Sequence, residues 1–176
     1  MEQIPMVIRV LSPEDASTYR ELRLQALQHN PEAFTTTYHD YVRRPIEQIQ
    51  EQLRPTPDKV TLAAFSGQNS DLLGTVTMVR NIPQKTRHIA EVVAMHVALL
   101  YRRRGIGKAL LQDLIQRARH VEGLDQLRLA VVTENTAAIN LYQSVGFRLY
   151  GIEPSALKSG DRTWDEALMA LVLKRG

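Results

Sequence analysis

Hydrophobic and polar residues alternate along the chain with two different periods, which separate predicted strands from predicted helices. Short runs rich in Val, Leu, Ile and Ala predict strands at residues 6–11, 60–65, 72–79, 89–100, 127–132, 147–152 and 163–173. Apolar residues at helical spacing predict helices at residues 12–27, 45–53 and 135–146, and a fourth that opens near residue 105 and ends at about residue 121.

The order of these elements predicts a single α/β domain over residues 1–176. The unit at residues 89–132 is strand, helix, strand, and this connection favours a parallel pair. The turn-rich sequence SGQNSD joins two predicted strands and favours an antiparallel hairpin. We therefore expect a mixed central sheet of six to seven strands with flanking helices.

The composition fits this domain and restricts its chemistry. Of the 176 residues, 44% are hydrophobic, which is enough for a sizeable core, and none is cysteine. The lack of cysteine excludes disulfides, thiolate metal sites and cysteine nucleophiles, and it fits a reducing compartment. No apolar run approaches the roughly 18 residues of a membrane-spanning helix, and the first ten residues do not read as a secretion signal. We expect a soluble, cytoplasmic protein with no membrane partner.

The charge gives little support to nucleic-acid binding. The formal net charge is +3, from 22 basic and 19 acidic residues, and the basic residues are bunched at 102–104 alone. A nucleic-acid-binding domain would rest on this charge only, because the chain lacks the interleaved aromatic and basic residues of an RNA-recognition motif. We expect a mixed, solvated surface and no nucleic-acid partner.

The stretch YRRRGIGKALLQDL, residues 101–114, suggests an anion site. Unpaired backbone N–H groups and the helix dipole favour an anion at a helix start, and glycines let a phosphate approach the backbone. The alternative is a tight turn with solvent-exposed arginines. Spacing excludes a Walker loop and a dinucleotide-binding G-x-G-x-x-G, because Arg102 and Leu110 stand where those motifs need glycine.

Two motifs resemble those of the GNAT superfamily of N-acetyltransferases. Arg102-x-x-Gly105-x-Gly107 is similar to the R/Q-x-x-G-x-G/A sequence that binds the pyrophosphate of acetyl-CoA in that family. Asn135-x-x-Ala138-x-x-x-Tyr142-x-x-x-Gly146-Phe147 resembles its second motif, about 30 residues further on. The order of elements also parallels the family fold, so the resemblance covers nearly the whole chain and implies a GNAT-like domain.

The resemblance implies acetyl-CoA as cosubstrate and a set of residues that bind it. The strand that ends near residue 97 would pair its backbone with the pantetheine arm, as an added strand does. No group of histidines and carboxylates has metal-ligand spacing, so we expect no metal. The residues expected to bind acetyl-CoA are Met95, Val97, Arg102, Arg103, Arg104, Gly105, Ile106, Gly107, Lys108, Asn135 and Tyr142.

Two positions depart from the family pattern. Leu99 stands where proline is common, and Arg103 where glycine is frequent. Arg103 fits the loop if its φ is negative, as is usual for a residue with a side chain. Its charge would then either reach the 3′-phosphate of CoA or lie in solvent.

Acetyl transfer to an amine requires two proton transfers, and two residues are candidates for the base and the acid that carry them out. The amine is mostly protonated at neutral pH, so a base helps, and the departing thiolate benefits from an acid. The resemblance places Tyr142 near the sulfur as the acid; otherwise it is a core tyrosine. Glu91, a carboxylate in an apolar strand, is the candidate base, with a salt-bridged strand residue as the alternative. His96 is the competing base, but strand alternation predicts that it faces the opposite side from Glu91.

The expected function is an N-acetyltransferase that moves an acetyl group from acetyl-CoA to a primary amine of a small molecule, peptide or protein. Ser144 lacks the G-x-S-x-G elbow, so we expect direct attack in a ternary complex. The alternative is a non-catalytic acyl-CoA-binding or sensing module on the same fold. The family's acceptor groove corresponds to residues 30–44 and 151–166, whose charges have both signs. The acceptor therefore stays open, as does the oligomeric state, for which a homodimer is one option.

Overall fold

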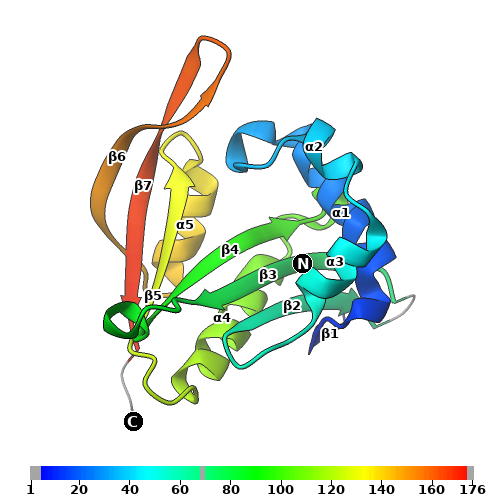
Figure 1. The fold of residues 1–176 in the computed structure, drawn as a ribbon, viewed down its shortest axis with the longest axis horizontal. Helices are drawn as coiled ribbons and strands as arrows, with labels where there is room; N and C mark the ends of the chain where they lie inside the picture. Colours follow the sequence, from blue (N-terminus) through cyan, green and yellow to red (C-terminus); the bar gives the residue numbers. More distant parts are fainter. Residues whose placement is uncertain (1–4, 68–69, 174–176) are drawn as a thin grey trace.

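The computed structural model describes residues 5–67 and 70–173, which form one sheet covered by helices on both faces (Figure 1). The sheet has seven strands in the order β1-β2-β3-β4-β5-β7-β6. These strands are β1 (Met6–Val10), β2 (Lys59–Ser66), β3 (Leu72–Arg80), β4 (Ile89–Val97), β5 (Gln126–Val132), β6 (Arg148–Ser159) and β7 (Arg162–Val172). The helices are α1 (Ala16–His29), α2 (Tyr38–Val42), α3 (Ile46–Leu53), α4 (Ile106–Arg119) and α5 (Thr136–Ser144).

The sheet is mixed, which confirms the predicted fold class. β4 and β5 are parallel neighbours joined by α4, and each of the other neighbouring pairs among the described strands is antiparallel. The predicted hairpin at residues 60–79 is the β2–β3 pair. Figure 1 shows the two halves of the sheet turned away from each other, with β6 and β7 rising beside β5.

Two buried clusters lie on opposite faces of the sheet. On one face α4 packs its apolar side, including Leu110 and Leu114, against Val76 and Met78 of β3. Tyr142 of α5 belongs to the same cluster. The other cluster joins α1 and α3 to the β1–β3 side of the sheet and contains Leu11, Tyr19, Tyr41 and Ile49. Sandwiching the sheet between two helical layers removes apolar surface from water on both faces, which is the main source of stability in such a fold.

The first helix starts later than the sequence pattern predicts, for a local reason. Pro13–Asp15 form a 3₁₀ turn (η1), and α1 begins at Ala16. The carboxylate of Asp15 accepts a hydrogen bond from the Ser12 backbone N–H at 2.9 Å and pairs with Arg9 at 2.7 Å. This bond to Arg9 lowers the pKa of Asp15 against the opposing effect of partial burial. The turn is therefore anchored to β1 before the α-helix starts.

Other differences from the predicted elements follow from short-range geometry. The strand predicted at 89–100 ends at Val97, because Leu99–Tyr101 form a 3₁₀ turn (η4). The strand predicted at 147–152 extends to Ser159. α2 was not predicted because five residues are too few to show helical periodicity; its first turn is capped by Thr37, whose hydroxyl accepts from Asp40 N–H at 3.1 Å.

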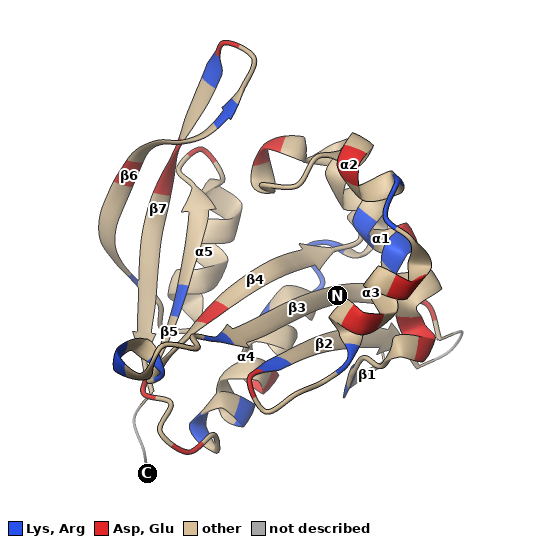
Figure 2. Cartoon of the chain, in the orientation of Figure 1, with Lys and Arg blue, Asp and Glu red and all other residues tan. Residues whose placement is uncertain are grey.

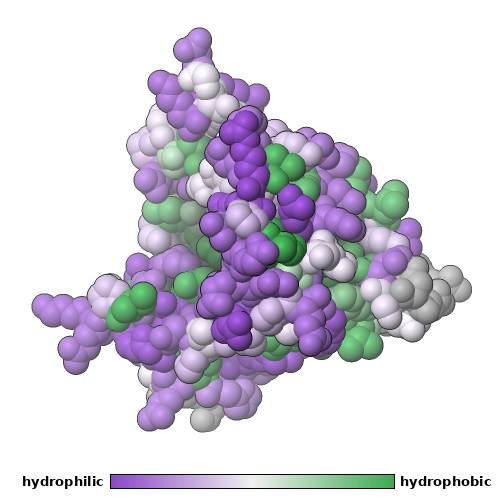
Figure 3. Space-filling view, turned by 45° about the vertical axis from the view of Figure 1, so that its right-hand side comes forward, coloured by the Kyte–Doolittle hydropathy of each residue, from purple (hydrophilic) through white to green (hydrophobic). Residues whose placement is uncertain are grey.

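The surface that faces the viewer in Figure 3 is mainly hydrophilic, with small hydrophobic areas between polar ones. Among the described residues, no helix combines the length and the apolar character that crossing a membrane requires. Within the same residues, no three His, Cys, Asp or Glu side chains come close enough together to hold a metal ion.

Candidate active site

The site begins where the two parallel strands separate. β4 and β5 pair at only three positions, from Ile89 with Gln126 to Glu91 with Arg128, and then diverge (Figure 1). Beyond Glu91 no described strand pairs with the side of β4 that faces β5, although both strands continue for several residues. Backbone N–H and C=O groups need partners, so such an opening suits an extended ligand that carries amide groups.

A cavity of ≈ 710 Å³ occupies this opening. Its walls come from the second half of β4, the end of β5, the loop before α4, the first turns of α4 and α5, and the segment after α1. The predicted residues on its wall are Met95, Val97, Arg102, Arg103, Gly105, Ile106, Gly107, Lys108, Asn135 and Tyr142. Two predicted residues, Glu91 and Arg104, do not line it.

A β-bulge in β4 changes which face of the sheet each cavity residue occupies. Thr77 of β3 pairs with Val93, but Thr75 pairs with His96, so β4 has one extra residue between the two pairs. Ala94, within the bulge, has a φ of 51°, in the left-handed region. Residues that pair directly in an antiparallel sheet point to the same side, and Val79 pairs with Glu91. Glu91 and His96 therefore face the same side, and the predicted opposite orientation is wrong.

The glycine loop starts α4 with its N-terminus on the cavity. Gly105 is the N-cap and has a φ of 79°, which a side chain would strain. Gly107 is buried, and a Cβ there would come within 3.0 Å of Leu141 Cδ2 and 3.1 Å of Met95 Cε. The second glycine thus lets α4 approach α5 and β4 closely. The free N–H groups of the first turn of α4 lie at the same place.

Arg103 has a φ of 62°, so it does not meet the condition of a negative φ under which a side chain fits this loop without strain. A residue with a side chain costs roughly 1–2 kcal/mol in the left-handed region, which explains why glycine is frequent there in the family that the motif resembles. Its side chain is exposed, as are those of Arg104 and Lys108. Figure 2 shows basic residues in the loop that precedes α4. Three exposed cations therefore surround the start of a helix whose dipole favours anions.

Arg102 is held differently from its neighbours. Its Nε donates to the carbonyl oxygen of Val97 at 3.1 Å, and Nη2 donates to Oδ1 of Asn30 at 2.8 Å. The side chain thus ties the end of β4 to the segment after α1. Arg102 lines the cavity, but two of its donors are already used by the protein.

The second motif forms the opposite wall. Asn135 caps α5, since its Oδ1 accepts from Ala138 N–H at 3.1 Å. Tyr142 lies two turns further along the helix, is 8% exposed and lines the cavity. Its ring meets Phe147 edge-on, with centroids 5.9 Å apart. Burial raises the pKa of Tyr142 to about 12, so the phenol keeps its proton at neutral pH.

The two candidate bases have different surroundings. Glu91 is half-buried at the last paired position of β4; burial raises its pKa, and Arg128 on β5 opposes that rise. His96 lines the cavity and is 9% exposed. Burial, with the charges of Arg102, Arg23 and His29, lowers the pKa of His96 to about 4. His96 is therefore uncharged at neutral pH and resists taking up a proton.

The resemblance placed residues 30–44 in the acceptor groove, but none of the residues that the segment after α1 contributes to the wall was predicted individually. Asn30, Glu32, Ala33 and Phe34 line the cavity there, from a 3₁₀ turn, η2 (Pro31–Ala33), and its flanks. The ring of Phe34 meets His96 edge-on with centroids 6.3 Å apart. The break in helical periodicity at HNPEAF marks this segment as a loop, but sequence spacing does not show that it folds back over β4.

The geometry suits a long, phosphorylated ligand that carries amides along its length. The cavity runs from cations and free N–H groups at the start of α4 to a buried phenol on α5, along a strand whose side is unpaired. Acetyl-CoA has phosphates at one end, two amides in its pantetheine arm and a thioester at the other end. The donors on the wall match it in that order.

Comparison with known proteins agrees with this geometry. Residues 21–147 match the family model described as the acetyltransferase (GNAT) family. The L-amino acid N-acetyltransferase AaaT of Escherichia coli K12 is 28% identical over 160 residues, which span 89% of this chain and 91% of that protein. A GNAT-family acetyltransferase from Streptococcus pneumoniae superposes with a TM-score of 0.83 at 24% identity, covering 96% of this chain and 99% of that one. The putative acetyltransferase yncA from Salmonella typhimurium, solved with acetyl-CoA, has a TM-score of 0.81 at 22% identity, covering 98% and 96%.

The chain belongs to the GNAT family of acetyltransferases. This confirms the resemblance drawn from the two motifs and identifies an N-acetyltransferase that uses acetyl-CoA as acetyl donor. The relatives favour acetyl transfer over a non-catalytic acyl-CoA-binding module.

Proposed function

We propose that the chain binds acetyl-CoA in the cavity between β4 and β5 and transfers the acetyl group directly to a primary amine. The amine nitrogen attacks the thioester carbon, the new C–N bond forms, and the C–S bond breaks. Glu91, directly or through water, takes the proton that the amine loses, and Tyr142 gives its proton to the departing thiolate. Glu91 then releases its proton to solvent and Tyr142 regains one from solvent, so the enzyme returns unchanged.

The observation that carries this proposal is the continuity of one cavity from the start of α4 to Tyr142. Gly105 and Gly107 expose the anion-favouring end of the helix, and the parting of the strands leaves room for the pantetheine arm. The buried phenol at the far end has a raised pKa, which suits a group that must hold a proton until the thiolate leaves.

The acceptor in this proposal is a small molecule that carries a primary amine. The relative from Escherichia coli is named as an L-amino acid N-acetyltransferase and matches nearly the full length of both chains. That match favours a small amine over a peptide or protein acceptor.

A thiol-release assay tests the proposed function. The purified chain is incubated with acetyl-CoA and separate amines: amino acids, polyamines, aminoglycosides and short peptides. We expect CoA release above the rate without acceptor for at least one class, and mass spectrometry should find that amine heavier by one acetyl group. Tight binding of acetyl-CoA with no transfer to any amine would instead indicate the acyl-CoA-sensing module.

We also propose a cytoplasmic location and a homodimer. The lack of cysteine fits a reducing compartment.

The exposed apolar residues Leu149 and Ile152 lie on β6, at the edge of the sheet, where a second copy of the chain can pack. Light scattering of the purified chain distinguishes a dimer from a monomer.

A further inference from the structure

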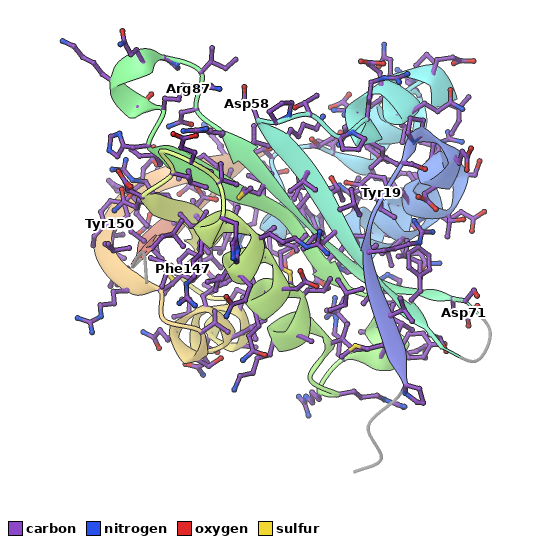
Figure 4. All side chains as sticks on the ribbon, turned by 90° about the horizontal axis from the view of Figure 1, so that it is seen from below. Tyr19, Asp58, Asp71, Arg87, Phe147 and Tyr150 are labelled. Carbon is purple, nitrogen blue, oxygen red and sulfur yellow. The ribbon has the colours of Figure 1, made fainter. Side chains whose placement is uncertain are left out.

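A group of polar side chains without partners lies between α1 and α2. The hydroxyls of Tyr19 and Tyr41, Nε of Arg20 and Nη1 of Arg23 are all covered and have no hydrogen-bond partner. Both tyrosines are 1% exposed. Figure 4 shows Tyr19 on the side of α1 that faces the sheet. A buried polar group left unpaired costs roughly 1–3 kcal/mol, so four of them in one place need an explanation.

The charge around these hydroxyls is positive. The guanidinium groups of Arg23 and Arg44 lie close enough to oppose the rise that burial causes in the pKa of Tyr19, and they act in the same way on Tyr41. The Arg44 Cζ atom is 5.1 Å from the centroid of the Tyr41 ring. Arg20 is tied to α2, because Nη2 donates to the carbonyl oxygen of Val42 at 2.6 Å.

Ion pairs with acidic side chains do not account for these arginines among the described residues. Within the part of the chain that the structure describes, none of Arg20, Arg23 and Arg44 forms an ion pair with a carboxylate. The three arginines are partly buried, and a charge partly removed from water gains from a partner of opposite sign. An anion from outside the chain would satisfy both the cations and the unpaired hydroxyls.

The cluster adjoins the cavity through one aromatic ring. Arg23 Cζ lies 4.3 Å from the centroid of Phe34, and Phe34 meets His96 edge-on; both rings line the cavity. The positive charge of Arg23 also helps to lower the pKa of His96. The cluster therefore lies next to the cavity wall at Phe34, although its own residues do not line the cavity.

Two carboxylates lie side by side on β6 and β7, at the other end of the strand order from β1. Glu153 of β6 and Glu166 of β7 pair directly across the strands, and Figure 2 shows acidic residues there and basic residues on α1. Burial and the neighbouring Glu153 raise the pKa of Glu166. Two adjacent carboxylates repel an anion, so an acceptor with both charges would point its negative end toward α1 and α2.

We propose that Arg23, Tyr19 and Tyr41, supported by Arg20 and Arg44, bind a carboxylate of the acceptor, so that the substrate is an amino acid or a similar amine that also carries a carboxylate. This rests on the proposed function and names its acceptor class. A carboxylate accepts several hydrogen bonds and matches the planar donors of a guanidinium. Because both hydroxyls are covered, the five-residue helix α2 has to shift slightly as the carboxylate enters.

The test compares each amino acid with its carboxamide, which keeps the amine but removes the negative charge. In the native chain we expect kcat/KM to be at least tenfold higher for the acid form, mainly through KM. The acid-to-amide ratio should fall at least tenfold in Arg23→Gln and several-fold in Tyr41→Phe, while KM for acetyl-CoA stays the same. Taking the ratio for each variant cancels the difference in amine basicity between acid and amide.

Arg43→Gln is the matched control, because Arg43 is exposed, adjoins the cluster and loses the same charge. Its acid-to-amide ratio should stay native. An unchanged ratio in Arg23→Gln, or an equal fall in Arg43→Gln, would overturn the inference. Should Arg23→Gln not fold, Tyr41→Phe alone decides the test, since it removes one unpaired hydroxyl and keeps the ring.

A binding measurement separates this inference from the proposed function. Calorimetry with CoA-saturated protein measures the affinity of the same acid and amide pairs without turnover. Preference for the acid that disappears in Arg23→Gln supports the carboxylate site even if no acetyl transfer occurs. Equal affinity for acid and amide in the native chain rejects the site, whatever the thiol-release assay shows.

Discussion

Tyr142 has the position and the protonation state that the proposed general acid requires. It is 8% exposed and lines the cavity, and its pKa of about 12 keeps the phenol protonated. We expect Tyr142→Phe to lower kcat by about 10²–10⁴-fold, the usual range for a general acid, with little change in acetyl-CoA affinity. Steady-state kinetics and calorimetry measure the two quantities. Tyr150→Phe is the control, because Tyr150 is 56% exposed and lies outside the cavity. A native kcat in Tyr142→Phe would show that water protonates the thiolate.

The choice of base is tested by the pH profile. A base works only when deprotonated, so activity that depends on Glu91 is lost as the pH falls through its raised pKa. Glu91→Gln should lose rate near neutral pH and recover as the pH approaches the pKa of the amine, where a base is no longer needed. The exposed Glu122→Gln serves as control. If Glu91→Gln keeps the native profile and His96→Gln loses the acidic limb, His96 is the base.

Individual residues of the site differ in how far sequence alone could assign them. Gly105, Gly107 and Tyr142 were predictable because each sits at a fixed spacing in a motif, and all three line the cavity. The φ of Arg103 was not predictable, since nothing in the residue type indicates a left-handed conformation. The prediction for Arg102 was incomplete, because it did not include the hydrogen bond to Asn30. Asn30 is distant in sequence and is brought near Arg102 only by the fold.

At the scale of elements, the bulge in β4 is the feature that sequence alternation could not reveal. A mixed sheet of six to seven strands followed from the apolar pattern and the order of elements, but a single extra residue at Ala94 reverses the alternation beyond it. Counting residues from Glu91 to His96 therefore predicted the wrong face of the sheet for His96. The same bulge helps β4 turn away from β5, so the error fell on the element that forms the site.

The bulge predicts an unusual response to substitution at Ala94. A β-branched residue is strongly disfavoured at a φ of 51°, so Ala94→Val should lower the free energy of unfolding by about 1–3 kcal/mol. Ala94→Gly should cause no loss, because glycine adopts this conformation freely. Urea denaturation measures both. The control is Ala130→Val in β5, because Ala130 is a strand residue that does not have a positive φ. For this variant we expect the free energy of unfolding to change by no more than roughly 0.5 kcal/mol. Equal losses in Ala94→Val and Ala130→Val would contradict the strained bulge.

At the scale of the whole molecule, the ligand proposed for the cavity would join elements that the chain itself leaves apart. β4 and β5 pair at three positions and are then separated by the cavity, whose walls come from residues 30–34 and from residues between 92 and 142. A ligand that fills this gap binds the folded chain and has no matching site in the unfolded one. At a concentration 100 times its Kd, such a ligand stabilises the fold by about 2.7 kcal/mol.

Acetyl-CoA should therefore raise the melting temperature by roughly 5–10 °C at that concentration, given about 2–4 °C per kcal/mol for a chain of this size. Differential scanning fluorimetry with increasing acetyl-CoA measures the shift. A fragment that carries only the adenosine phosphates should give a smaller shift, because it reaches the start of α4 but does not fill the gap between the strands. An oligonucleotide should give none at physiological salt, where binding through phosphates alone is weak. Equal shifts for the fragment and for acetyl-CoA would mean that the pantetheine arm lies outside the β4–β5 opening and that the arrangement proposed for the site is wrong.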